Sequence, residues 1–139
     1  MIALALTDEE IAACFPVMQE LRPHLGAGEF VKTVRALQVD GYALARLASE
    51  GRVVAAAGYR IKQNLARGTF LYVDDLVTLA SERRKGHGQQ LFAWLVAKAH
   101  ALRIGELVLD SGLQRTEAHA FYEKLGMTFT ARHYHLPLK

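Results

Sequence analysis

The sequence is poor in cysteine, and this scarcity bears on where the protein works. Cys14 is the only cysteine among 139 residues, so no disulfide can form within the chain. A protein without disulfides is typical of a reducing compartment, and we expect a cytoplasmic location. Cys14 falls on the apolar face of an expected helix, so we interpret it as a core residue rather than a reactive thiol.

Long apolar runs are also lacking. No stretch approaches the roughly 20 consecutive apolar residues that a membrane-spanning helix needs. The first six residues, Met1 to Leu6, have no basic flank and no cleavage site, so they do not resemble a signal peptide. We therefore expect no membrane partner.

There is no strong excess of charge of either sign. The chain has 17 Lys and Arg against 14 Asp and Glu, for a net charge of +3, with a pI of about 9.2. A nucleic-acid-binding domain can have such a balance. The basic residues are scattered, however, except at Arg83 to Lys85, where a phosphate site would explain them equally well. We expect no nucleic-acid partner.

What the sequence does contain is enough apolar material for one globular domain. Hydrophobic residues make up 51% of the chain, too many for a disordered protein. The length suits one domain with one core, and no repeat, low-complexity tract or linker divides it. We predict a single domain over residues 1–139.

The spacing of apolar residues predicts alternating helices and strands. Thr7 is expected to cap the first helix with Glu10 as its capping-box partner, and Pro16 to kink that helix. The predicted helices cover residues 8–21, 29–38, 88–102 and 116–125. The predicted strands cover residues 2–6, 42–47, 53–61, 69–79, 106–109 and 128–136.

The most informative stretch is the end of the strand over residues 69–79 and the basic turn that follows it. Gly86 and Gly88 open the next helix, and glycines allow a ligand to approach the backbone closely. The free N–H groups and the positive dipole end of a helix favour an anion. We predict a phosphate or pyrophosphate site from Arg84 to Gln89. Its spacing fits neither a P-loop nor the dinucleotide fingerprint.

Two motifs give the chain a family resemblance. The pattern Arg83-x-x-Gly86-x-Gly88 resembles the acetyl-CoA signature of the GNAT acetyltransferases, Arg/Gln-x-x-Gly-x-Gly/Ala. The segment from Ala118 to Met127 resembles the family's Ala-x-x-Phe-Tyr-x-x-x-Gly-Phe, with Met127 in place of phenylalanine. The resemblance covers nearly the whole chain. It implies the GNAT fold, of α/β (α+β) class, with a mixed, mostly antiparallel sheet flanked by helices.

The resemblance also implies acetyl-CoA as the co-substrate and assigns residues to it. The pantetheine arm would bind the backbone groups of Leu76, Val77 and Thr78. The pyrophosphate would bind mainly backbone N–H groups of the six residues Arg84, Lys85, Gly86, His87, Gly88 and Gln89. No metal is implied, and the histidines near the C-terminus are interpreted as packing or edge residues.

The reaction implied is transfer of the acetyl group to a primary amine of a small molecule or a protein, by direct attack in a ternary complex. Tyr122 matches the family's general acid, which protonates the CoA sulfur. The resemblance also suggests the base, because the family's bases often lie on this strand, on the face that alternation gives to Tyr72, Asp74, Leu76 and Thr78. Asp74 is therefore our candidate base, acting directly or through water. Asp74 could instead bind a cationic substrate or make ordinary hydrogen bonds.

Several alternatives stay open at this point. The base could be Asp75 or a chain of waters, and the chain could be a catalytically silent acyl-CoA-binding regulatory module. Arg115 stands where the family often has an asparagine. We expect the acceptor side of the site near Glu29 and the loop from Pro23 to Gly28. The acceptor's identity is open, and a homodimer is possible.

Overall fold

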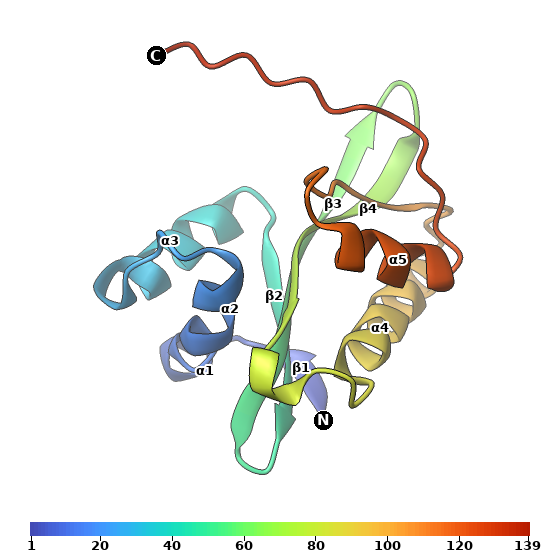
Figure 1. The fold of residues 1–139 in the computed structure, drawn as a ribbon. Helices are drawn as coiled ribbons and strands as arrows, with labels where there is room; N and C mark the ends of the chain where they lie inside the picture. Colours follow the sequence, from blue (N-terminus) through green and yellow to red (C-terminus); the bar gives the residue numbers. More distant parts are fainter. The chain divides into compact units, whose positions relative to one another are not determined.

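The computed structural model describes all 139 residues (Figure 1). The chain forms two compact units, Met1–Val108 and Leu109–Lys139. The first unit carries the sheet apart from Leu109, together with four α-helices and one 3₁₀ turn. The second unit carries one helix. The prediction of a single domain over residues 1–139 stays a prediction.

A five-stranded sheet with strand order β1-β2-β3-β4-β5 forms the middle of the first unit. The neighbours β1 to β4 are antiparallel, and β5 follows β4 after a helix, a connection typical of parallel neighbours. The sheet is thus the mixed, mostly antiparallel sheet that the sequence predicted. The strands are β1 (Ile2–Leu4), β2 (Ala43–Ser49), β3 (Arg52–Asn64), β4 (Gly68–Thr78) and β5 (Leu107–Leu109).

Helices cover both faces of this sheet. Figure 1 shows α1, α2 and α3 on one face and α4 on the other, and α2 and α4 both contact β3 and β4. The fully buried side chains Ile11, Leu44, Leu71, Leu91 and Leu95 come from both helical layers and the sheet between them. The helices of this unit are α1 (Asp8–Ala12), α2 (Phe15–Leu21), α3 (Ala27–Val39), the 3₁₀ turn η1 (Ala80–Glu82) and α4 (His87–Ala101).

The first predicted helix is in fact two helices. A turn after Ala12 separates α1 from α2, and Pro16 lies in the first turn of α2 rather than in the middle of a longer helix. Proline suits a first turn because its missing N–H would have no partner there. The kink expected at Pro16 is therefore a complete break.

Cys14 lies in that turn and is confirmed as a core residue. Its side chain is fully buried, and Sγ lies 3.4 Å from the backbone oxygen of Glu10. Burial raises the pKa of the thiol to about 11, so it stays protonated at neutral pH.

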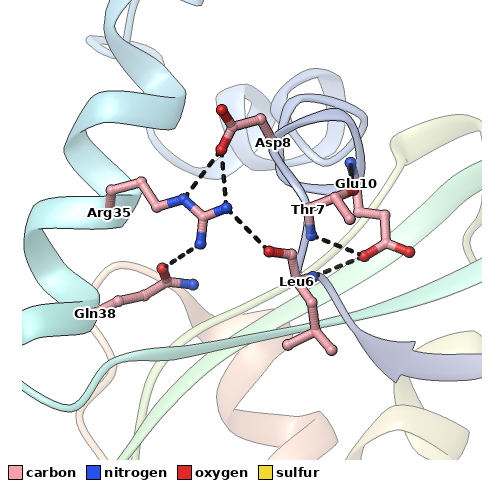
Figure 2. A network of polar contacts seen from close by, with 6 residues as sticks. All are labelled: Leu6, Thr7, Asp8, Glu10, Arg35 and Gln38. Atoms are coloured by element: carbon pink, nitrogen blue, oxygen red, sulfur yellow. Dashed lines mark hydrogen bonds and ion pairs between the residues drawn. The ribbon is translucent and has the colours of Figure 1, made fainter.

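The start of α1 is held by the predicted capping box (Figure 2). Thr7 Oγ1 accepts a hydrogen bond from the Glu10 N–H at 3.1 Å, and Glu10 Oε1 accepts from the N–H groups of Thr7 and Leu6. Arg35 of α3 donates to Asp8 Oδ1 and to the Leu6 carbonyl. This network joins α3 to the beginning of α1.

The second unit contains α5 (Thr116–Lys124), where a helix was predicted. Gly126 follows the helix with φ of +94°, a conformation that glycine adopts without strain. The strand predicted over residues 128–136 is wrong, since residues 127–139 form no helix or strand. Its apolar alternation suits a strand, but a strand forms only beside a backbone partner, and the sheet order ends at β5.

The Glu10 carboxylate should make stability depend on pH. Hydrogen bonds from the Thr7 and Leu6 N–H groups lower the pKa of Glu10, as does Arg46 nearby. A lowered pKa stabilises the fold above the ordinary carboxyl pKa, and this stabilisation is lost as the pH falls through the lowered value. Glu10→Gln should therefore lower the denaturation midpoint at pH 7 and leave it close to wild type at about pH 2.5.

Urea denaturation of both proteins at the two pH values would measure this difference. Glu9→Gln is the matched control, because Glu9 lies in the same helical turn without the capping role. An equal loss of stability for Glu10→Gln at both pH values would contradict the charge-based account.

Candidate functional site

The strand β4 contains a β-bulge at Asp74. Asp75 pairs with Gly58 of β3 and Val73 pairs with Tyr59, so Asp74 is an extra residue with no opposite partner. A bulge leaves one residue outside the ladder and bends the strand, and bulges are frequent beside active sites. No pattern in the sequence predicted it.

The bulge changes which side chains share a face. Tyr72 and Asp75 pair with Arg60 and Gly58, which are two residues apart on β3 and therefore lie on the same face. The expectation that Leu76 and Thr78 share this face with Tyr72 is wrong, because they pair with Ala57 and Ala55, and the extra residue shifts the alternation beyond Asp74. Asp75, rather than Leu76, lies on the same face as Tyr72, and this face is covered by α1, α2 and α3.

Arg22 binds the bulge from the C-terminal end of α2. Its Nε donates to Asp75 Oδ1 at 3.0 Å, and its Nη2 donates to the backbone oxygen of Asp74 at 2.9 Å. The backbone carbonyl of the bulge residue thus has a side-chain hydrogen-bond partner. Arg22 is a site residue that the sequence analysis missed, and only knowledge of the bulge would have identified it.

Tyr42, just before β2, completes the coordination of Asp75. Its hydroxyl donates to Asp75 Oδ2 at 2.7 Å, and its ring is buried with the Arg60 guanidinium 5.6 Å from its centre. Burial, followed by the nearby Asp75 charge, strongly raises the pKa of Tyr42, which keeps the hydroxyl protonated as a donor. Both oxygens of Asp75 are therefore engaged.

Asp74 has a different environment. Its Oδ2 accepts a hydrogen bond from Arg60 Nε at 3.2 Å, and its side chain is 25% exposed. Burial raises the pKa of Asp74, an effect that Arg60 opposes and the neighbouring Asp75 charge reinforces. A raised pKa makes this carboxylate a stronger base than an ordinary aspartate.

The predicted phosphate site lies between η1 and α4. Gly86 is the N-cap of α4 with φ of +83°, and Arg84 also has a positive φ of +66°. No side chain caps α4, so the first backbone N–H groups of the helix are not taken by the protein's own capping residue. The turn has the geometry and charge to bind an anion through its backbone.

The charged side chains around this turn are partly paired. Lys85 Nζ donates to Glu82 Oε2 at 2.9 Å, and this hydrogen bond is the main cause that lowers the pKa of Glu82. His87 is largely buried, with Nε2 3.6 Å from Glu82 Oε1 and no hydrogen bond to either ring nitrogen. The sequence analysis gave His87 mainly a backbone role and did not identify Glu82.

The predicted pantetheine stretch, Leu76 to Thr78, pairs on one edge with β3. On the other edge, the Leu71 N–H donates to the Glu106 carbonyl at 3.0 Å, next to the start of β5. A three-residue strand is roughly 10 Å long, whereas Leu71 to Leu76 spans roughly 16 Å. Strand β5 therefore ends before it can pair with Leu76, Val77 or Thr78.

Tyr122 belongs to the second unit and lies on α5. Burial raises the pKa of its hydroxyl, and the charge of Arg115, the N-cap residue of the same helix, partly opposes this rise. The His119 ring nitrogen Nε2 lies 2.8 Å from the backbone oxygen of Gly112. The His133 ring nitrogen Nδ1 lies 3.3 Å from Asp110 Oδ2. Tyr122 is thus protonated at neutral pH and has a cationic neighbour in its own unit.

No three His, Cys, Asp or Glu side chains gather in a group that could hold a metal ion. None of the helices is both long enough and apolar enough to cross a membrane.

Sequence comparison places these features among known proteins. Residues 5–127 match the model of the acetyltransferase (GNAT) family. The chain is also 33% identical over 134 residues to the uncharacterized N-acetyltransferase YhdJ of Bacillus subtilis (strain 168). That alignment covers 95% of this chain and 94% of YhdJ.

Solved structures with the same fold include enzymes with different acceptors. The ribosomal-protein-alanine N-acetyltransferase of Brucella melitensis matches with a TM-score of 0.85 and 18% identity, covering 100% of this chain and 99% of that one. AAC(6')-Iy, in complex with the bisubstrate analogue CoA-S-monomethyl-acetylneamine, matches with a TM-score of 0.83 and 18% identity over 100% and 97% of the chains. At this identity the likeness establishes the fold alone.

Gly58 is the residue whose replacement should test the geometry around the bulge. A Cβ at this position would lie 1.8 Å from the Tyr42 hydroxyl oxygen, so Tyr42 would have to leave Asp75. Gly58→Ala should lower the free energy of unfolding by about 1–3 kcal/mol, the usual cost of overpacking a core.

Gly28→Ala is the control for this substitution, because Gly28 lies on α3 and a Cβ there meets nothing within 4 Å. It should be neutral or stabilising by up to about 1 kcal/mol, since alanine is the better helix former. Chemical denaturation would compare the two variants. Equal stability of Gly58→Ala and wild type would contradict the close packing of Tyr42.

Proposed function

Because the chain belongs to the acetyltransferase (GNAT) family, we propose that it transfers the acetyl group of acetyl-CoA to a primary amine by direct attack in a ternary complex. The protein is an N-acetyltransferase of this family. The acceptor and the roles of individual residues are the parts that we propose. The observation that carries the proposal is the uncapped N-terminus of α4 behind the left-handed residue Gly86.

The turn fits the pyrophosphate of CoA. The backbone N–H groups from Gly86 to Gln89 lie at a helix N-terminus, where a negative charge is favoured by about 0.3–1 kcal/mol when exposed and by more when partly buried. Arg84 and Lys85 add positive charge beside them. When bound, acetyl-CoA supplies the activated acetyl group.

The pantetheine arm would lie along β4 from Leu76 to Thr78. These residues have backbone groups on the edge that β5 does not reach. An extended arm with two amides can take up such groups as an incomplete extra strand does. The bulge immediately before Leu76 bends β4 away from regular pairing, which makes room for the reacting groups.

Asp74 and Tyr122 would handle the two protons of the reaction. The amine nitrogen forms a bond to the acetyl carbon as the C–S bond breaks. The attacking nitrogen gives up one proton, and the departing CoA sulfur takes one. Asp74, with its raised pKa, would accept the first directly or through water, and the protonated Tyr122 would donate the second.

Blocking the turn should abolish cofactor binding. Gly86→Glu adds a negative charge where the pyrophosphate would bind, and it places a side chain on a residue with φ of +83°. The dissociation constant for acetyl-CoA, measured by calorimetry, should rise at least about 100-fold, equivalent to roughly 2.7 kcal/mol.

The matched control is Gly105→Glu, which introduces the same charge at an exposed glycine with no neighbour within 4 Å of a Cβ. Its affinity for acetyl-CoA should stay within about twofold of wild type. Equal affinities for Gly86→Glu and Gly105→Glu would place the pyrophosphate elsewhere.

Removing the Tyr122 hydroxyl should slow the chemistry without weakening cofactor binding. Tyr122→Phe keeps the ring and should lower kcat by about 10²-fold or more, the usual contribution of a positioned acid. The release of CoA thiol measures turnover, and calorimetry measures acetyl-CoA affinity.

Tyr134→Phe provides the control for the same chemical change in the same unit, because Tyr134 lies outside any helix or strand. Full activity of Tyr122→Phe would show that Tyr122 is not the general acid. Tight acetyl-CoA binding without turnover by the wild-type protein, over a broad amine panel, would instead favour the silent acyl-CoA-binding module.

A further inference from the structure

A cavity of about 390 Å³ lies within the first unit, between α2, α3 and the sheet. It is bounded by both of these helices, by the loop between them, by Tyr42 just before β2 and by Asp75 on β4. Its size lies near the lower end of the range for small-molecule sites, about 300–1,000 Å³. The apolar residues that line it are Met18, Leu25, Phe30, Val34 and Leu37.

The cavity has a buried floor and an exposed entrance. Tyr42, Phe30 and Val34 are buried, whereas His24 and Thr33 are exposed. Asp75 lines the cavity and directly precedes Leu76, the first residue of the proposed pantetheine stretch. Consecutive Cα atoms are about 3.8 Å apart, so the Asp75 wall of the cavity is close to the strand along which the pantetheine arm would lie.

The charge of the lining is already balanced. Asp75 is the one carboxylate in the lining, and its two oxygens accept hydrogen bonds from Arg22 and the Tyr42 hydroxyl. Glu29, suggested by the sequence as an acidic acceptor contact, does not line the cavity, although the loop residues His24 and Leu25 do. A polycation would find no unpaired negative group on these walls.

We propose that this cavity binds the acetyl acceptor, and that the acceptor is a primary monoamine on a compact apolar body, either a branched aliphatic chain or a single ring. Apolar walls favour such a body by roughly 25 cal/mol for each Å² removed from water. The paired Arg22 and Asp75 provide a polar but neutral end. The proposal deepens the acetyltransferase function and rests on it for the reaction, while occupancy of the cavity is measurable by itself.

The test uses the full chain and three amines that differ in charge and apolar body: 2-phenylethylamine, spermidine and a short peptide with an N-terminal alanine. Turnover is followed by the release of CoA thiol. We expect kcat/KM for 2-phenylethylamine to exceed that of the other two amines by at least about tenfold. Better use of spermidine or of the peptide would overturn the assigned acceptor class.

A substitution at the entrance tests the location. Thr33→Trp should obstruct the cavity from an exposed helical position, and Lys32→Trp adds the same side chain to the neighbouring exposed position, which does not line the cavity. Thr33→Trp should raise the KM for 2-phenylethylamine at least about tenfold and leave the affinity for acetyl-CoA unchanged. Lys32→Trp should keep this KM within about twofold of the wild-type value. Equal effects of the two variants on KM would overturn the placement of the amine in the cavity.

Direct binding separates this proposal from the acetyltransferase function. Saturation-transfer NMR with 2-phenylethylamine and no acetyl-CoA should detect binding to wild type and Lys32→Trp, with a clear loss in Thr33→Trp. Binding with this pattern, but without affinity for acetyl-CoA, would refute the proposed reaction and support the cavity as an amine site. Acetyl transfer to an amine that is unaffected by Thr33→Trp would support the reaction and refute the cavity.

Discussion

The first unit depends on the hydrogen bonds that Arg22 makes to the bulge in β4. A bulge leaves backbone groups without a ladder partner, and an unpaired buried carbonyl costs about 1–3 kcal/mol. Arg22 binds that carbonyl and the carboxylate of the next residue from the end of α2. One side chain therefore joins the end of α2 to the bend in the strand and neutralises a charge at the edge of the cavity.

The two adjacent aspartates illustrate how neighbours in sequence acquire different properties. Asp75 is held by Arg22 and Tyr42, so it acts as a structural anion with both oxygens engaged. Asp74 contacts Arg60 and has a raised pKa because burial outweighs that contact. The different partners of the two carboxylates, and not their positions in the sequence, therefore account for the difference.

Much of the fold could be predicted from the sequence, because its signals are local. The capping box at Thr7, the apolar face of α4 and the glycine turn at Gly86 all follow from spacing along the chain. The family resemblance also predicted a mixed, mostly antiparallel sheet, and the structure contains such a sheet. The match to the family model confirmed the family itself. The assignments of Tyr122 and Asp74 to catalysis stay predictions.

The features that could not be predicted depend on partners distant in sequence. Arg22 and Asp75 are 53 positions apart, and nothing in either segment indicates that they meet. The bulge depends on the register between β3 and β4, which alternation of side chains in one strand does not encode. The strand expected over residues 128–136 failed for a related reason, because apolar alternation cannot supply the backbone partner that a strand requires.

The environment of Glu82 has a consequence for how selectively the basic turn attracts anions. Its carboxylate binds Lys85 and lies 3.4 Å from Arg52 of β3, so part of the positive charge near α4 is cancelled before any ligand arrives. Long-range steering depends on net charge and is screened over about 8 Å at physiological salt. The attraction that remains at a distance is therefore weaker than the number of basic residues suggests, and selection of a ligand depends more on phosphates that reach the backbone N–H groups themselves.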